Sequence, residues 1–190
     1  MTLHGLVLAG GQSRRMGQDK AALTLGGRSL LARAMTLVEG VCDEAFVSVR
    51  ESVQEGERGR YRQIADAHGG VGPADGIASA FVHSPASAWL VVACDLPRLS
   101  ADVLATLIAG RDANADATAY ANDDGLPEPL CAIYEPSSRA QIATFVANDM
   151  RCPRKMLLSM NTTLLAPAAD DALANANTPE QWRSIAGASN

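Results

Sequence analysis

The 190-residue sequence lacks three features that would each point to a particular class of protein. No apolar run approaches the roughly 20 residues that a membrane-spanning helix needs, so we expect no membrane protein. The net charge of −5 leaves no broad positive surface of the kind that DNA- and RNA-binding proteins use, so we expect no nucleic-acid partner. No basic segment precedes the first apolar run and the arginines follow it, which is the reverse of a secretory signal, so the sequence predicts a cytoplasmic protein.

Cysteine patterns that hold metals or form disulfide frameworks are also absent. The chain has four cysteines and three histidines, but it has no CxxC pair and no cysteine at ligand spacing from a histidine. This spacing predicts neither a zinc site nor a disulfide framework, and it favours buried thiols. The cysteines are Cys42, Cys94, Cys131 and Cys152.

What is present is an ordinary globular composition in which strand and helix patterns alternate. Hydrophobic residues make up 47% and charged residues 19%, and no linker or repeat divides residues 1–190, which we expect to form one domain. Strands are expected at residues 6–9, 45–49, 62–65, 89–93, 116–121, 130–134 and 162–165. Helices are expected at residues 30–39, 73–81, 101–109, 136–148 and 154–159, and from Thr178 onward. The alternation predicts a three-layer, Rossmann-like α/β fold with a mostly parallel central sheet, and leaves a mixed sheet open.

Local signals mark some of these boundaries. Ser29 and Ser100 stand where a hydroxyl can cap the first turn of the helix that follows. Gly72-Pro73 opens another helix, with proline at its favoured first position. Residues 51–60 are charged and contain glycine, which predicts an exposed loop or a short helix.

The most informative segment is a glycine-rich loop that follows the first predicted strand. Its sequence is Leu8-Ala9-Gly10-Gly11-Gln12-Ser13-Arg14-Arg15-Met16-Gly17-Gln18-Asp19-Lys20. Ligands of open α/β sheets bind beyond the carboxyl ends of the strands, where glycine lets backbone N–H groups approach phosphate. The two arginines and the lysine add the charge that a phosphate chain requires. The loop fits neither GxxxxGK[ST] nor GxGxxG, and an isolated Gly-Gly pair would be interpreted as a solvated turn.

Two later segments carry oxygen ligands. Asp95 directly follows the strand predicted at 89–93, a position at which a carboxylate can bind Mg²⁺ together with substrate phosphates. The alternative is a turn-forming aspartate that ends the strand before Pro97. Asn175 and Asn177 precede Thr178-Pro179, and their amides could also ligate Mg²⁺; a helix start explains the threonine and proline but not the asparagines.

The glycine-rich loop resembles LAGGxSxRMGxDK, the signature of the molybdenum cofactor guanylyltransferases within the nucleotidyltransferase superfamily. Cys94-Asp95-Leu96-Pro97 resembles the CDxP motif of that family, and residues 175–180 resemble its NxNTPE motif. The resemblance implies Mg²⁺ as cofactor, held by Asp95, Asn175 and Asn177. It implies catalytic roles for Lys20, Arg15 and Asp95. It implies nucleotide binding by Leu8, Ala9, Gly10, Gly11, Lys20, Asp66, Gly76 and Asp95.

The resemblance also covers segments that border the base and the pterin. Asp66 and residues 72–77 resemble the Asp…GPLxGI segment of the family, but Asp75 stands where a small residue is more common. That carboxylate could bind guanine, or it could simply favour the positive end of its helix. Residues 128–134 and 151–156 resemble the segments that border the pterin, which implies pterin binding by Arg14, Arg154 and Lys155. The alternative for Arg154 and Lys155 is that they are solvated surface cations.

The activity that the resemblance implies is transfer of GMP from GTP to molybdopterin, with release of pyrophosphate and without a covalent enzyme intermediate. It implies GTP and molybdopterin as substrates and molybdoenzyme-maturation proteins as partners. Transfer of CMP, or transfer to a sugar phosphate, is the nearest alternative, and Gly10-Gly11 favours the guanylyl enzymes because cytidylyl relatives typically carry LAAG. A nucleotide-binding regulator without catalysis is the alternative from another class, and a catalytic set of Lys20, Asp95 and two asparagines argues against it.

Overall fold

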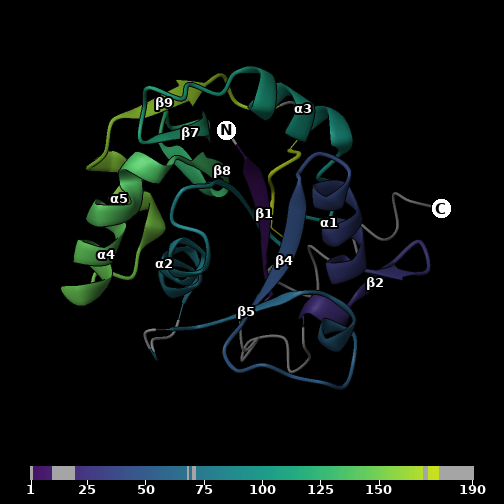
Figure 1. Cartoon of the computed structure of the whole chain (residues 1–190). Helices are drawn as coiled ribbons and strands as arrows, with labels where there is room; N and C mark the ends of the chain where they lie inside the picture. Colours follow the sequence, from purple (N-terminus) through teal and green to yellow (C-terminus); the bar gives the residue numbers. More distant parts are fainter. Residues whose placement is uncertain (1, 10–19, 68, 70–71, 169–170, 176–190) are drawn as a thin grey trace.

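The computed structural model describes residues 2–9, 20–67, 69, 72–168 and 171–175. Its centre is a seven-stranded sheet of order β5-β4-β1-β6-β8-β7-β9 (Figure 1). The strands are β1 (Leu3–Leu8), β4 (Glu44–Val49), β5 (Gln63–Ala65), β6 (Ala88–Ala93), β7 (Ala117–Ala121), β8 (Pro127–Tyr134) and β9 (Thr162–Leu165). The α-helices are α1 (Leu30–Glu39), α2 (Pro73–His83), α3 (Ala101–Ala109), α4 (Arg139–Ala147) and α5 (Pro153–Leu158).

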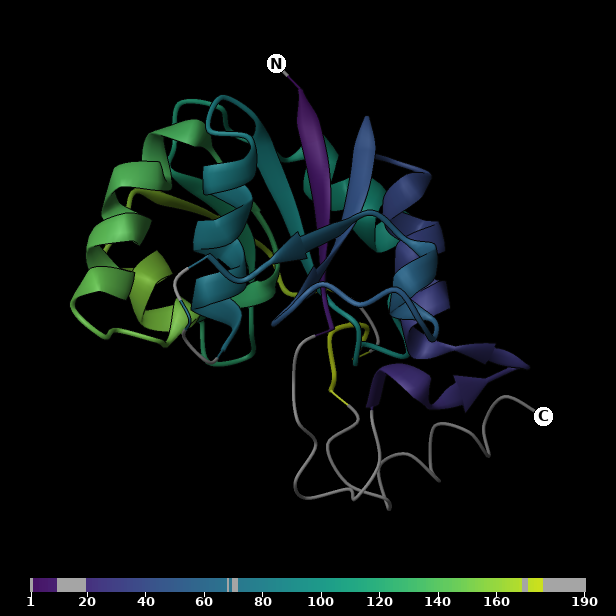
Figure 2. The ribbon, with the colours of Figure 1, turned by 60° about the horizontal axis from the view of Figure 1, so that its bottom comes forward.

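Helices cover both faces of the sheet and make the predicted three-layer fold. One hydrophobic core joins α1 and α3 to one face, with Val7 and Val92 pointing into it. The other core joins α2, α4 and α5 to the opposite face, with Leu6 and Val91 pointing into it. Figure 2 shows α2 and α4 side by side on one face and α1 across the sheet from them. Every residue of β6 is buried, as the uninterrupted apolar run predicts for a central strand.

The sheet is mixed, because β8 runs against both of its neighbours. β1 pairs in parallel with β4 and β6, β4 pairs in parallel with β5, and β7 pairs in parallel with β9. β8 pairs antiparallel with β6 and β7, and Cys131 lies opposite Val92. Since Cys131 is in the middle of β8, the first residues of that strand extend past the end of β6. The start of β8 therefore lies at the same edge of the sheet as the carboxyl ends of β1 and β6.

The predicted caps are present, and one hairpin was missed. The side chain of Ser29 accepts a hydrogen bond from the Ala32 amide at 2.9 Å, and Ser100 caps α3 in the same way. The missed element is the short hairpin of β2 (Thr24–Leu25) and β3 (Arg28–Ser29). Its turn is Gly26-Gly27, and both residues have positive φ, which two-residue hairpin turns often require. The glycine pair was the signal that could have revealed it.

Three 3₁₀ helices complete the described structure: η1 (Lys20–Ala22), η2 (Arg58–Arg60) and η3 (Pro136–Ser138). Residues 51–60 are the predicted exposed segment, and η2 ends it. The helix expected from Thr178 onward lies outside the described residues. In the part of the chain that the structure covers, no helix is both long enough and apolar enough to cross a membrane.

The expectation of buried thiols is correct for some cysteines and wrong for Cys152. The structure has the four cysteines as thiols rather than as disulfide halves. Cys94 and Cys131 are buried and Cys42 is half-buried, whereas Cys152 is exposed because it lies in the connection between α4 and α5. Burial raises the pKa of the Cys131 thiol to about 12, so that thiol stays protonated and unreactive at neutral pH.

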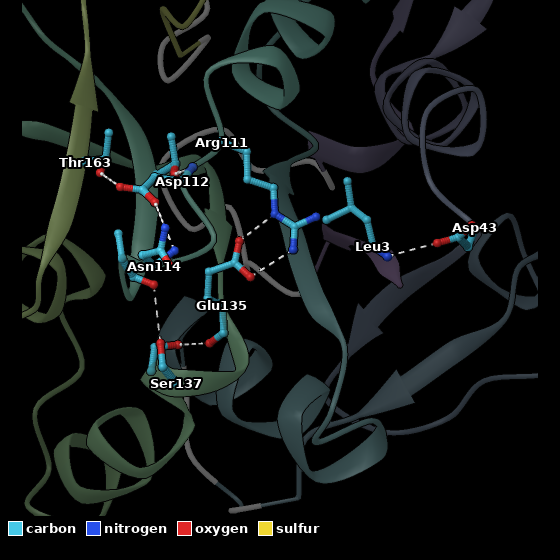
Figure 3. A network of polar contacts seen from close by, with 11 residues as sticks. Leu3, Asp43, Arg111, Asp112, Asn114, Glu135, Ser137 and Thr163 are labelled. Atoms are coloured by element: carbon cyan, nitrogen blue, oxygen red, sulfur yellow. Dashed lines mark hydrogen bonds and ion pairs between the residues drawn. The ribbon is translucent and has the colours of Figure 1, made fainter. Parts of the chain in front are cut away.

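A polar network joins Glu135, directly after β8, to Arg111, shortly after α3 (Figure 3). Nε of Arg111 donates to one oxygen of the Glu135 carboxylate at 2.6 Å, and Nη2 donates to the other at 2.9 Å. The side chain of Glu135 is only 1% exposed, so this guanidinium neutralises a buried charge. The hydrogen bond to Glu135 raises the pKa of Arg111 above its ordinary value. Asp112, beside Arg111, accepts from Thr163 of β9 and from Asn114.

We expect Arg111→Met to destabilise the protein strongly, because it leaves the buried Glu135 carboxylate without its partner. Breaking a buried ion pair from one side typically costs about 3–5 kcal/mol in the free energy of unfolding. Urea denaturation measures the loss, and Arg139→Met, at an exposed arginine on α4, is the matched control. A loss within about 0.5 kcal/mol, the usual range for an ordinary surface substitution, would contradict the assignment.

Candidate functional site at the carboxyl ends of β1 and β6

The two central strands end side by side at the predicted loop. Leu8 pairs with Ala93, and the Cys94 amide donates to the Leu8 carbonyl at 3.2 Å. Asp95 is the next residue and is half-exposed. Since Ala9 directly follows β1, the structure brings Asp95 next to the point where the chain enters the glycine-rich loop. The turn that was the alternative for Asp95 is also present, because residues 94–95 form a turn after β6.

Much of the predicted phosphate-binding segment lies outside the described residues. This applies to Gly10, Gly11, Arg14 and Arg15, and to the side chain of Lys20, whose backbone begins η1. Asn177 also lies outside them. The roles predicted for these residues stay predictions.

The described residues 171–175 contact the chain that follows Asp95 through an ion pair. Nη1 of Arg98 is 3.6 Å from Oδ2 of Asp171, and Arg98 is only three residues after Asp95. Oδ1 of Asn175 is buried, and no described residue donates a hydrogen bond to it. A buried acceptor without a partner is costly, so this amide oxygen suits a cation or a donor supplied by a ligand.

The residues present at this edge fit Mg²⁺ in chemical type. Mg²⁺ takes oxygen ligands and is usually bound by one or two carboxylates together with substrate phosphates and water. Asp95 offers a carboxylate and Asn175 an unpaired amide oxygen. Among the described residues no group of three or more histidine, cysteine, aspartate or glutamate side chains could hold a metal ion. Any metal here would therefore depend on phosphate oxygens and water as well as on protein ligands.

Arg58 is a residue that sequence reasoning missed. Its Nη2 donates to the Ala9 carbonyl at 2.7 Å, so a cation from η2 reaches the last described residue before the glycine-rich loop. Gln63 keeps the preceding loop in place, because its amide nitrogen donates to the carbonyls of Val53 and Arg58. The sequence offered no signal for this contact, since residues 51–60 resemble an ordinary solvated loop.

Asp66 and Gly76 lie at the same edge of the sheet, on the β5 side. Asp66 directly follows β5, and its amide donates to the Val49 carbonyl at the end of β4. Gly76 is in the first turns of α2, where a Cβ atom would lie 2.6 Å from Ser48 Oγ and 2.8 Å from Leu8 Cδ2. Close packing of α2 on β1 and β4 is therefore enough to explain this glycine. Its predicted contact with the nucleotide stays a prediction.

Asp75 has a partner that neither sequence interpretation anticipated. Its side chain is fully buried in the first turn of α2, which agrees with the helix-end interpretation. It forms an ion pair with Arg151, which lies beyond α4 and 76 residues away in sequence. In the sequence, Arg151 is only one of the three cations of the segment 151–156.

The two segments expected to border the pterin are brought together. Nη2 of Arg154 is 2.7 Å from Oε1 of Glu128, and Nε of Arg154 donates to the Pro127 carbonyl at 3.0 Å. Arg154 is therefore engaged with the start of β8, whereas Lys155 is exposed. Whether either side chain contacts a pterin stays a prediction.

The sheet is mixed and covered by helices, and a carboxylate follows its central strand at the edge where a glycine-rich loop begins. This arrangement is typical of the nucleotide-binding α/β class. Residues 5–164 match the family described as "MobA-like NTP transferase domain". The match covers most of the chain, so the chain belongs to this family and is a nucleotidyltransferase.

Relatives with known names agree. The chain is 34% identical over 184 residues to a molybdenum cofactor guanylyltransferase of Xanthomonas euvesicatoria, covering 94% of this chain and 91% of that protein. It is 36% identical over 186 residues to a molybdenum cofactor biosynthesis bifunctional protein of Synechocystis, covering 96% of this chain but only 53% of that longer protein. The crystal structure of molybdopterin-guanine dinucleotide biosynthesis protein A from Archaeoglobus fulgidus has a TM-score of 0.83 at 26% identity, with 97% of each chain covered.

We expect Gly76→Ala to destabilise the fold by about 1–3 kcal/mol, the usual effect of adding a methyl group to a packed interior. The new methyl group would collide with Ser48 Oγ and with the end of the Leu8 side chain. Thermal unfolding of Gly76→Ala and of Ser48→Ala/Gly76→Ala tests this cause, because removing the hydroxyl should restore part of the loss. An unchanged midpoint in Gly76→Ala would show that packing does not require the glycine.

Proposed function

We propose that this chain transfers the GMP group of GTP to the phosphate of molybdopterin and releases pyrophosphate. The observation that carries the proposal is the position of Asp95, which directly follows the hydrogen bond joining the ends of β6 and β1. That position puts a carboxylate next to the loop predicted to hold the triphosphate. Relatives of nearly the same length named as guanylyltransferases support the choice of nucleotide and acceptor.

Positioning and charge neutralisation account for the catalysis we propose. The attacking group is a phosphate oxygen, which is already an anion, so the reaction needs no strong general base. It forms a bond to the α-phosphorus of GTP while the bond to the departing pyrophosphate oxygen breaks on the opposite side. We expect Lys20 to neutralise the charge that develops on pyrophosphate, and Arg15 to hold phosphate oxygens. Arg58 would keep the end of β1 in place through its bond to the Ala9 carbonyl.

We expect Asp95, Asn175 and Asn177 to hold Mg²⁺. When bound, the ion would neutralise phosphate charge and make the phosphorus more electrophilic. Asp95 contributes the negative charge that attracts the cation, while the asparagines add oxygen ligands without repelling the triphosphate.

The partners we propose follow from the same reaction. GTP would bind at the carboxyl ends of β1, β4 and β5, near the start of α2. Molybdopterin would bind next to it, near the starts of β8 and α5. Transfer of the dinucleotide to molybdoenzyme-maturation proteins would follow in the cytoplasm, where GTP is available.

We expect Asp95→Ala and Lys20→Ala each to lower turnover by roughly 100-fold or more, as loss of one group that stabilises transition-state charge does in other enzymes. Pyrophosphate release with GTP, Mg²⁺ and molybdopterin measures the effect, and the folded state is checked by circular dichroism. Glu39→Ala and Arg139→Ala are the matched controls, since both residues are exposed and lie near the opposite ends of the strands. Turnover near the wild-type rate in either test variant would defeat the assignment of that residue.

We expect GTP with Mg²⁺ to raise the melting temperature more than CTP with Mg²⁺, because a ligand stabilises the native state in proportion to its affinity. Equal concentrations of both nucleotides, with and without Mg²⁺, give the comparison. A larger shift with CTP would favour a cytidylyltransferase. GTP binding without pyrophosphate release from molybdopterin or a sugar phosphate would favour a regulator.

A further inference from the structure

Asp75 and Arg151 form an ion pair that ties α2 to the segment we call the acceptor arm, residues 149–155. Nη1 of Arg151 donates to Oδ1 of Asp75, whose side chain is fully buried. Nε of the same guanidinium donates to Asp149 Oδ1 at 2.9 Å. Arg151 is therefore held from two sides, by a carboxylate of α2 and by a carboxylate of its own arm.

The arm connects the two sides of the strand-end edge. Its first part reaches α2, which packs on β1 and β5, the side that carries Asp66. Its last part begins α5, whose Met156 and Leu157 are buried in the core, and Arg154 there bonds to Glu128 at the start of β8. The contact with Asp75 thus fixes the position of Arg151 in the arm, and the contact with Glu128 fixes the position of Arg154.

The local charge argues against an anion-binding role for this guanidinium. Arg151 carries one positive charge, but Asp75 and Asp149 carry two negative charges against it, so the group as a whole repels phosphate. Lys155 is the cation of the arm that has no ion-pair partner among the described residues. The pair can assist phosphate binding only by placing the rest of the arm.

Stability alone does not explain the pair either. Replacing a buried ion pair by apolar residues is often neutral or stabilising, whereas removing one partner is costly. Oδ2 of Asp75 is buried and receives no hydrogen bond from any described residue, so the burial of this carboxylate is only partly compensated. The arm is further constrained at Asp149, a non-glycine residue with φ of +60°. These costs are consistent with a geometric role.

We propose that Asp75 and Arg151 are positioning residues that set the acceptor arm, and with it Lys155, for binding of the acceptor phosphate. This inference rests on the proposed function, because that function supplies the acceptor. Through this pair, the affinity for molybdopterin depends on Asp75 of α2, the helix next to the predicted nucleotide site. Affinity for GTP depends on it much less, because the arm does not belong to the predicted nucleotide site.

The decisive variant is Asp75→Ala/Arg151→Met, which removes both charges and leaves none buried. We expect its melting temperature to stay close to that of the wild type, its Kd and KM for molybdopterin to rise about tenfold or more, and its Kd for GTP to change less than about twofold. Hydrogen exchange of the arm amides should speed up while exchange in α3 stays unchanged. Glu39→Ala/Arg139→Met, which removes one acidic and one basic side chain at exposed positions near the opposite ends of the strands, is the control.

The outcomes separate this inference from the proposed reaction. Unchanged molybdopterin affinity in the folded double variant, or unchanged exchange in the arm, overturns the positioning role. A wild-type protein that binds both ligands but forms no dinucleotide overturns the proposed reaction, while the molybdopterin Kd of the variant still decides the positioning role. A wild-type protein that does not bind molybdopterin overturns both. If the double variant does not fold, Asp75→Asn and Arg151→Lys provide the same comparison of the two affinities.

Discussion

The alignment of β1 with β6 is the constraint on which the rest of the molecule depends. Both strands are buried on both faces, so a slip of one residue would exchange the residues that face α1 with those that face α2. The register is therefore strongly specified, and it ends with the hydrogen bond from the Cys94 amide to the Leu8 carbonyl. Because β1 and β6 end side by side at that bond, Asp95 and the start of the glycine-rich loop lie next to each other.

The reversed direction of β8 gives this edge its second side. A parallel strand would end at the edge as β6 does, whereas β8 begins there and brings Glu128 with it. Arg154 and α5 then attach to that beginning. In the reaction we propose, nucleotide and acceptor would approach one another from opposite sides of Asp95, which is the arrangement that direct transfer of a nucleotidyl group requires.

The sequence predicted the features that local chemistry determines. The cap at Ser29 and the succession of strands and helices along the chain were predictable, because periodicity and capping depend on neighbouring residues. β8 was predicted from residue 130 rather than 127, since the two prolines at its start disguise a strand whose first residues lie beyond its partner. The family motifs singled out Asp95 and Asn175, whose roles stay predictions. The contact of Arg58 with Ala9 and the Asp75–Arg151 pair were not predictable, because each depends on distant segments meeting.

The stereochemistry at the α-phosphorus distinguishes direct in-line transfer from a reaction through a covalent enzyme intermediate. One diastereomer of GTP carrying sulfur on its α-phosphorus would be converted with molybdopterin, and the configuration of the product determined. A single displacement, in which the acceptor phosphate attacks opposite the departing pyrophosphate, predicts a product of inverted configuration. Retention of configuration would reveal two successive displacements through a covalent enzyme intermediate and would contradict direct transfer from GTP to molybdopterin.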